Sequence, residues 1–277
     1  MPSAAVKKRR LDASIFMVEE KPARLMRHAP PFGYKFGVGP NAFSLEELYA
    51  KRRNATLPTV RHFRSCAVVG SSGNLRHHRL GPEIDAHDAV IRVNGAPLSS
   101  SYSAMVGART TWRVFASPRA VSATKFKEED TYPNESLIVL CNREYVYSCQ
   151  HVLFADRKPR VHGLNPRFYE SVQRQVHGKR HRHAPVVKVP LTGIVAVAVA
   201  MKSCDAVNVY GLSTMNWAAR PSCLYYWLCG RKGDNATDAR YHDRRMGLSA
   251  WFARHDFSLN AQALLGWNAS GVIRLRT

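Results

Sequence analysis

The chain has 277 residues, 45% of them hydrophobic, which is enough to bury one large α/β core and excludes a chain that is disordered throughout. Its 41 basic residues against 20 acidic ones give a formal net charge of +21. A positive field of that size attracts anions, but it does not distinguish nucleic acid, anionic lipid and a nucleotide-linked sugar as partners.

Residues 1–60 are predicted to form a basic, irregular arm or stem, with proline and glycine clustered between Pro30 and Pro40. One short helix is expected in it, over Ser44–Arg53 with Ser44 as its N-cap. No stretch has the about 18 uninterrupted apolar residues of a membrane span, and no secretory signal is visible. We therefore expect either a soluble protein or a chain whose anchor is missing from this sequence.

Residues 61–277 alternate short apolar segments with polar, helix-compatible stretches. Strands are expected first at Cys66–Gly70, Ala89–Asn94, Thr110–Phe115, Ser136–Cys141 and Val186–Val189. A buried helix is expected over Pro190–Ser203, with Thr192 as N-cap, because this segment is apolar all round. A strand at Val207–Gly211 follows it. This alternation predicts a single α/β domain with a central, mostly parallel, Rossmann-like sheet flanked by helices.

Two segments are candidate anion sites. The Gly/Ser-rich loop Gly70–Asn74 follows the first strand, and backbone N–H groups in such a loop can approach a phosphate closely. It has neither Walker A nor GxGxxG spacing, so an ordinary tight turn explains it equally well. The start of the buried helix, at Thr192 and Gly193, offers a hydroxyl, an amide and the positive end of the helix dipole. Simple N-capping is the alternative there.

Histidines and cysteines complete the set of reactive side chains. His242 and His255 lie in the C-terminal part, and imidazole titrates near neutral pH, so both are candidates for acid–base chemistry. The six cysteines contain no CxxC pair, so no metal site is expected, whereas free thiols and disulfides both stay open on count alone. Asparagine sequons, which favour a secretory route, occur at Asn54, Asn134, Asn235 and Asn268.

Four segments together resemble the motifs of one enzyme family. Cys66–Phe115 resembles the large sialyl motif of the animal-type sialyltransferases, glycosyltransferase family 29, almost without gaps. Val189–Gly211 resembles the small motif, Tyr241–Asp243 the short third motif, and His255–Leu275 the very small motif. They occur in the family's order and cover about residues 65–277. The resemblance implies a GT-A-like, seven-stranded fold.

The resemblance also implies an activity. It is an inverting transfer of sialic acid from CMP-sialic acid to a sugar hydroxyl of a glycoprotein or glycolipid, without metal or other cofactor. His255 would be the general base, and His242 would donate a hydrogen bond to the leaving phosphate. The implied partners are the CMP-sialic acid donor and a glycan acceptor, with no nucleic acid expected. The implied location is the Golgi, with membrane association only through an anchor not present in this chain.

Individual residues take roles from the same resemblance. Residues assigned to donor binding are Ser71, Ser72, Asn74, Asn94, Thr192, Gly193 and Gly211. Asp85 and Arg92 are expected to hold the large motif together instead of touching the donor. Cys66 and Cys204 match the family's disulfide between the two large motifs, which implies an oxidising compartment. Candidates for a further bridge are Cys223 with Cys229 and, less well supported, Cys141 with Cys149.

The sequence departs from the family pattern in two places. Asn260 stands five residues after His255, where the very small motif has a glutamate. The third motif lacks the aromatic run that follows its histidine, and the earlier cluster Tyr225–Trp227 either replaces it or belongs to the core. The acceptor would be recognised by variable loops at 116–132 and 151–183. Two alternatives stay open: a transferase for CMP-Kdo or a related acidic donor, and an inactive, basic, polyanion-binding relative.

Overall fold

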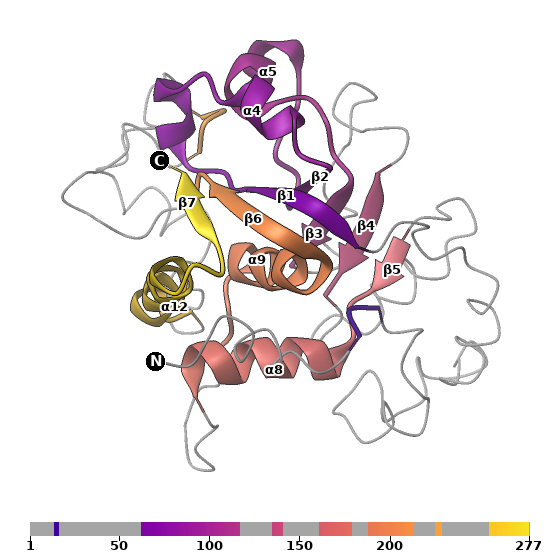
Figure 1. Cartoon of the computed structure of the whole chain (residues 1–277), viewed down its shortest axis with the longest axis vertical. Coiled ribbons are helices and arrows are strands. Elements are labelled where there is room, and N and C mark those ends of the chain that lie inside the picture. The colour runs from indigo at the N-terminus through magenta and orange to yellow at the C-terminus, as the bar shows by residue number, and fades with distance from the viewer. Residues whose placement is uncertain are drawn as a thin grey trace.

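A computed structural model describes residues 14–16, 62–116, 135–140, 161–178, 188–212, 225–228 and 255–276. These residues contain a seven-stranded sheet with helices on both of its faces (Figure 1). The strands are β1 (Phe63–Val69), β2 (Ala89–Val93), β3 (Trp112–Phe115), β4 (Ser136–Val139), β5 (Val161–Gly163), β6 (Cys204–Tyr210) and β7 (Arg274–Arg276). The helices are η2 (Gly73–His77), α4 (Gly81–Asp85), α5 (Ser100–Val106), α8 (Pro166–His177), α9 (Thr192–Ser203) and α12 (Phe257–Ala269). The α/β fold expected from the sequence is confirmed.

The strand order is β5-β4-β3-β2-β1-β6-β7, and every neighbouring pair is parallel. The chain therefore builds outward from β1 to β5, then returns through α8 and α9 to place β6 on the other side of β1. This reversal between β1 and β6 is a topological switch point. In open parallel sheets, ligands bind outside the carboxyl ends of the strands at such a point.

Strand residues alternate between two apolar layers. Val68 and Ile91 belong to a core with α8, α9 and α12, whereas Ala67, Val69 and Val90 belong to a second core with α4 and α5. Because successive side chains of a strand point to opposite faces, a sheet covered on both sides needs apolar residues at every position. That requirement explains why β2 (AVIRV) is buried throughout and reads as a nearly continuous apolar run.

Helix α9 is buried on all sides, as its uniformly apolar sequence predicts. Its expected start was wrong by one residue, because Leu191 is the N-cap and Thr192 is already helical. The Leu191 N–H donates to the Asn260 side chain at 2.9 Å, and Leu191 is extended, with ψ of 147°. The Leu191 side chain itself makes no capping hydrogen bond, so the contact with Asn260 is a long-range bond at the N-cap.

The expected strand at Val186–Val189 is wrong for its two described residues, Lys188 and Val189, which belong to no strand. The fifth strand lies earlier, at β5, inside the segment 151–183 that was expected to be loop. Helix α8 follows β5 and lies in the same segment. Three residues are too few to show a strand period. The Asn165-Pro166 pair at the start of α8, with the Asn165 side chain accepting from Arg167 N, was a readable helix signal.

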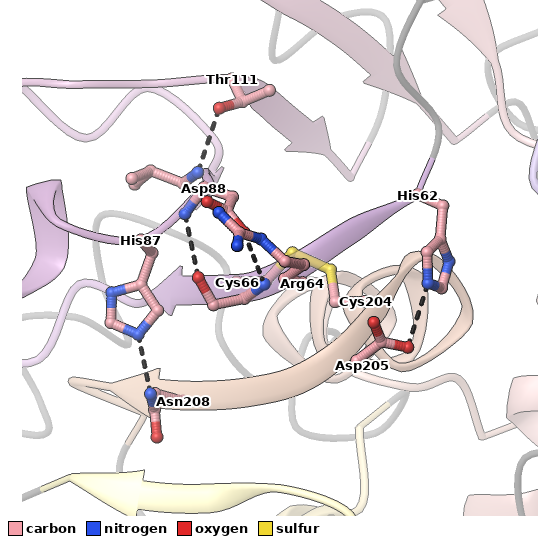
Figure 2. Close-up of a disulfide and its surroundings, with 11 residues drawn as sticks. His62, Arg64, Cys66, His87, Asp88, Thr111, Cys204, Asp205 and Asn208 are labelled. Atoms are coloured by element: carbon pink, nitrogen blue, oxygen red, sulfur yellow. Dashed lines mark hydrogen bonds and ion pairs between the residues drawn. A yellow bond between two sulfur atoms is a disulfide. The ribbon is translucent and has the colours of Figure 1, made fainter.

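A disulfide joins Cys66 of β1 to Cys204 of β6, as the family resemblance implied (Figure 2). The two Cα atoms are 6.0 Å apart, both residues are fully buried, and 138 positions separate them in sequence. Closing a loop of that length stabilises the fold by about 4–5 kcal/mol in the chain-entropy model. The bond therefore ties together the two strands that flank the switch point.

Three residues of the expected N-terminal arm are described, and they lie on the core. Phe16 forms an antiparallel bridge with Leu164, and its ring packs edge-on against Trp112 with centroids 5.9 Å apart. Residues 17–61, including the expected helix at Ser44–Arg53, lie outside the described residues, so the domain boundary near residue 60 stays a prediction. Within the described part of the chain, no helix combines the length and apolar character needed to cross a bilayer.

Candidate active site

The loop after β1 and the turn after β6 are bonded to each other at the switch point. Gly70 N donates to Tyr210 O at 2.8 Å, and Ser72 N donates to Gly211 O at 3.0 Å. A Cβ on Gly70 would lie 2.3 Å from Gly211 O, and one on Gly211, whose φ is +60°, would lie 2.4 Å from Leu75 Cδ1. Gly70 therefore requires glycine because the Gly211 backbone passes close to it, and Gly211 requires glycine because of its backbone conformation and the Leu75 side chain.

Leu212 connects this loop to the start of helix α9. Its Cδ2 atom would lie 2.5 Å from a Cβ on Gly70 and 2.6 Å from a Cβ on Gly193. The N-terminus of α9, where Thr192 is partly exposed, therefore adjoins the loop and the Gly211 turn. The first N–H groups of a helix have no partner within the helix and carry partial positive charge, so the expected residues Gly193 and Gly211 belong to a region suited to an anion.

The side chains of the Gly/Ser loop differ in their availability. Ser72 is mostly buried, and its hydroxyl accepts from Asn74 N at 3.3 Å as the cap of η2. Asn74 is exposed, whereas Ser71 is partly buried and its carbonyl accepts from Tyr226 N at 3.1 Å. Ser72 also forms a backbone bridge with Tyr225. Asn74 is thus the loop side chain best exposed to meet a ligand, and Ser72 shapes the loop.

Asn94 follows β2 at the same edge of the sheet and is held by its backbone. Its φ is +50°, and it is the single non-glycine residue with positive φ in the described part of the chain. Its N–H donates to Val114 O, its carbonyl accepts from Arg113, and its Oδ1 accepts from Ala116 N at 3.0 Å. Its Nδ2 makes no hydrogen bond with any described residue, which leaves two N–H donors for an anionic ligand.

Asp85 and Arg92 hold the large motif together, as expected. The Asp85 carboxylate accepts from Ala108 N and Arg109 N at 2.8 and 3.0 Å. Arg92 is fully buried and donates to Val106 O and Arg109 O at 2.8 and 2.9 Å. Burial lowers the pKa of Arg92 to about 10, so the guanidinium keeps its proton at neutral pH.

His255 lies beside the segment that leads into α9. Its Nδ1 is 3.0 Å from Val189 O, three residues before Thr192. A carbonyl oxygen can only accept, so Nδ1 carries the proton in this hydrogen bond and the neutral ring has its lone pair on Nε2. Asp256, the next residue, caps α12 by accepting from Leu259 N at 2.9 Å. The backbone contact with Val189 O favours a tautomer suited to a general base.

Asn260, at the position of the family's glutamate, is almost fully buried and uses both ends of its amide. Its Oδ1 accepts from Leu191 N at 2.9 Å, and its Nδ2 donates to Asp256 O at 2.5 Å. An ionised glutamate could accept the first bond but could not donate the second. The departure from the family pattern therefore leaves the turn around His255 well connected to the start of α9.

The aromatic cluster is partly buried in the core and partly exposed beside the Gly/Ser loop. Tyr226 is fully buried, and its hydroxyl donates to Pro97 O at 2.5 Å. Tyr225 and Trp227 are partly exposed and stack with centroids 4.7 Å apart, next to the Gly/Ser loop. Tyr226 therefore belongs to the core, and the replacement of the third motif's aromatic run by Tyr225 and Trp227 stays a prediction.

Several expected residues lie outside the described residues: Tyr241, His242, Asp243, Cys141, Cys149, Cys223 and Cys229. Among the residues that the structure does describe, no group of three His, Cys, Asp or Glu side chains is arranged to hold a metal. Sequence reasoning missed the buried pair Arg113 and Glu135, as well as Leu212. The charged residue inside the apolar strand WRVF was the one signal for the pair, because an arginine is rarely buried without a partner.

Comparison with known proteins agrees with the motifs. The sequence matches the family model described as Glycosyltransferase family 29 (sialyltransferase) over residues 17–145 and 140–253. It is 33% identical over 178 residues to the CMP-N-acetylneuraminate-beta-galactosamide-alpha-2,3-sialyltransferase 1 of Pan troglodytes, covering 59% of this chain and 48% of that protein. It is 28% identical over 228 residues to the CMP-N-acetylneuraminate-beta-1,4-galactoside alpha-2,3-sialyltransferase of Mus musculus, covering 74% and 59%.

The chain thus spans about half the length of the curated relatives it matches. The fold is similar to that in "Crystal Structure of a Mammalian Sialyltransferase", with a TM-score of 0.65 and 21% sequence identity. That match covers 99% of this chain and 94% of the other. At this identity the likeness supports the fold alone.

Proposed function

Because the chain belongs to glycosyltransferase family 29, the sialyltransferases, we propose that it transfers sialic acid from CMP-sialic acid to a sugar hydroxyl. The observation that carries the proposal is the hydrogen bond from His255 Nδ1 to Val189 O. It leaves the lone pair of the imidazole on Nε2. It also holds the ring against Val189, three residues before the helix start that is expected to bind the donor. A general base next to an anion site is the arrangement this reaction needs.

The donor is an anion with a phosphate and a carboxylate, and the groups proposed to bind it are donors of hydrogen bonds. The N-terminus of α9 at Thr192 and Gly193 supplies backbone N–H groups and a partial positive charge. The exposed Asn74 and the Nδ2 of Asn94 supply side-chain amides at the same edge of the sheet. The backbone of the Gly211 turn, which the loop after β1 contacts through Ser72 N, is proposed to pass close to the nucleotide.

The proposed reaction is one in-line displacement. The acceptor hydroxyl oxygen bonds to the anomeric carbon of sialic acid as the bond from that carbon to the phosphate oxygen breaks. The hydroxyl proton passes to Nε2 of His255, and CMP leaves with the bonding electrons. His242 is proposed to donate a hydrogen bond to the phosphate as charge builds there. A single displacement inverts the anomeric centre.

The acceptor and the location are also proposals. The names of the relatives specify β-galactosamide and β-1,4-galactoside acceptors, so galactose-terminated glycans are the first acceptors to test. The Cys66–Cys204 disulfide requires an oxidising compartment to form, which supports the Golgi lumen as the site of action.

The test is CMP release from CMP-sialic acid with a panel of galactose- and N-acetylgalactosamine-terminated acceptors. Acceptor-dependent release is expected from the wild type, with kcat reduced about 10²–10⁴-fold in His255→Ala while CMP still binds.

His62→Ala is the matched control, because this exposed histidine pairs with Asp205 at the opposite ends of the strands. A folded protein that binds CMP but releases none would favour another acidic donor, such as CMP-Kdo, or an inactive relative. Failure to bind CMP at all would contradict the proposal.

A further inference from the structure

Asn94 has a backbone conformation that needs support from its surroundings. A left-handed φ of +50° is unfavourable for a residue with a Cβ, and asparagine tolerates it better than most. Such conformations persist where neighbouring contacts enforce them, and they gather at ligand sites. The contacts that hold Asn94 therefore decide where its side-chain amide lies.

The strongest of these contacts comes from Arg113 of β3. Its Nη1 donates to Asn94 O at 2.9 Å and to Ala96 O at 3.0 Å, so one guanidinium grips the chain on both sides of residue 95. Its Nε and Nη2 donate to the two oxygens of Glu135 at 2.7 and 3.2 Å. The side chains of Arg113 and Glu135 are 0% and 4% exposed, so this is a buried, bidentate ion pair.

Stability alone is a poor reason for such a pair. The cost of removing two charges from water commonly cancels their attraction, and an apolar pair of similar volume often stabilises a fold equally well or better. An apolar pair, however, cannot donate to the carbonyls of Asn94 and Ala96. A lysine has no planar guanidinium, so it could not donate hydrogen bonds to a carboxylate and two carbonyls at the same time. The geometry therefore favours a role in shaping the turn after β2.

We propose that Arg113, oriented by Glu135, is a positioning residue for the donor nucleotide: it fixes the Asn94 backbone so that the Asn94 side-chain amide meets the bound CMP moiety. This inference rests on the proposed function, because it uses CMP as the ligand. The side-chain oxygen of Asn94 already accepts a hydrogen bond from Ala116 N. Arg113 holds the Asn94 backbone and thereby orients the two remaining N–H donors of Nδ2 toward the ligand. Arg113 itself touches no reacting atom.

The test uses variants that separate positioning from stability. The double variant Arg113→Met, Glu135→Leu removes the ion pair without leaving one buried charge alone; its melting temperature should fall by several degrees, because Asn94 O and Ala96 O lose this donor, and CMP binding is measured where the variant is folded. Its Kd for CMP, measured by calorimetry, should rise about tenfold, which corresponds to about 1.4 kcal/mol.

Arg92→Lys is the matched control, since Arg92 is equally buried on the adjacent strand but donates to Val106 O and Arg109 O instead of Asn94 O. Its Kd for CMP should change less than about twofold.

A double-mutant cycle with Asn94→Gly identifies the route of the effect. Glycine accepts the positive φ but has no amide, so removing the ion pair in that background should not weaken CMP binding further. Glu135→Gln provides a second variant if the double variant does not fold, with an expected loss of CMP affinity about threefold. An unchanged CMP affinity in these variants, or full additivity with Asn94→Gly, would overturn the inference alone. A wild type that does not bind CMP would overturn the proposed function as well.

Discussion

The side-chain oxygen of Asn260 accepts a hydrogen bond from Leu191 N at 2.9 Å, which joins the turn that follows His255 to the residue before helix α9. The same amide donates to Asp256 O. A side chain from the C-terminal motif thus positions the start of the helix that belongs to the small motif. The helix start proposed to bind the donor and the turn that carries the proposed base, His255, are therefore joined by hydrogen bonds.

Replacing Asn260 should therefore affect stability and activity together. In Asn260→Ala, Leu191 N loses its partner and Asp256 O keeps only the backbone N–H of residue 260, which should lower the free energy of unfolding by about 1–3 kcal/mol and reduce kcat. Urea denaturation and CMP-release assays measure the two effects. Gln262→Ala, an exposed change on the same helix, should alter stability by less than about 0.5 kcal/mol. Equal effects of the two variants would contradict the role of Asn260.

Gly211 should not tolerate a side chain. Gly211→Ala strains a φ of +60° and drives its Cβ against Leu75, so we expect a loss of stability of about 2–4 kcal/mol and weaker CMP binding. Gly178→Ala is the matched control, because Gly178 has a φ of +75° and, among the residues that the structure describes, no atom lies within 4 Å of the added Cβ. It should cost only about 1–2 kcal/mol and leave CMP affinity unchanged. Thermal unfolding and calorimetry distinguish the two, and similar CMP affinities would argue against a ligand at the Gly211 turn.

Reduction of the Cys66–Cys204 disulfide should destabilise the protein. Dithiothreitol, or the variant Cys66→Ala, Cys204→Ala, should lower the free energy of unfolding by about 2–5 kcal/mol. Denaturant titration with and without reductant provides the measurement. In the double alanine variant the reductant should have little further effect, and a large remaining effect would assign the stabilisation to other cysteines of the chain.

His177 at the end of α8 should make stability depend on pH. Burial, opposed by the Val189 backbone and the Asp256 carboxylate and aided by Lys188, lowers its pKa below the ordinary 6.5. The unfolded chain then binds this proton more readily than the folded one, so stability should fall as pH drops below about 6.5. Melting temperatures between pH 7.5 and 5.5 should decline less in His177→Gln than in the wild type. An identical decline would remove His177 as a cause, and His62→Ala controls for the loss of an exposed histidine.

Tyr226 should hold the aromatic cluster against the site. Tyr226→Phe removes the hydrogen bond to Pro97 O, which should cost about 1 kcal/mol in unfolding free energy. Because Tyr226 N is bonded to Ser71 O, we also expect a modest rise in the Kd for CMP. Urea denaturation and calorimetry report the two quantities, and a variant as stable as the wild type would contradict the contribution of the hydroxyl.

The sequence by itself determined the features that depend on local pattern. The apolar runs of β1, β2 and β6 and the all-apolar helix α9 are readable because a doubly covered sheet and a buried helix need apolar residues on every side. The long motif resemblance pointed to the family, the Cys66–Cys204 pair and the candidate residues at the carboxyl edge of the sheet. His242 stays a prediction, because it lies outside the described residues.

Only the tertiary structure decided which distant residues meet. The three-residue strand β5 has no period of its own and takes its hydrogen bonds from β4. Three features each depend on a partner at least 19 positions away in sequence: the start of α9 at Thr192, the tautomer of His255 and the hydrogen bond from Arg113 to Asn94 O. A hydrogen bond between residues so far apart leaves no periodic trace in the sequence, since it exists only once the sheet and its helices have packed.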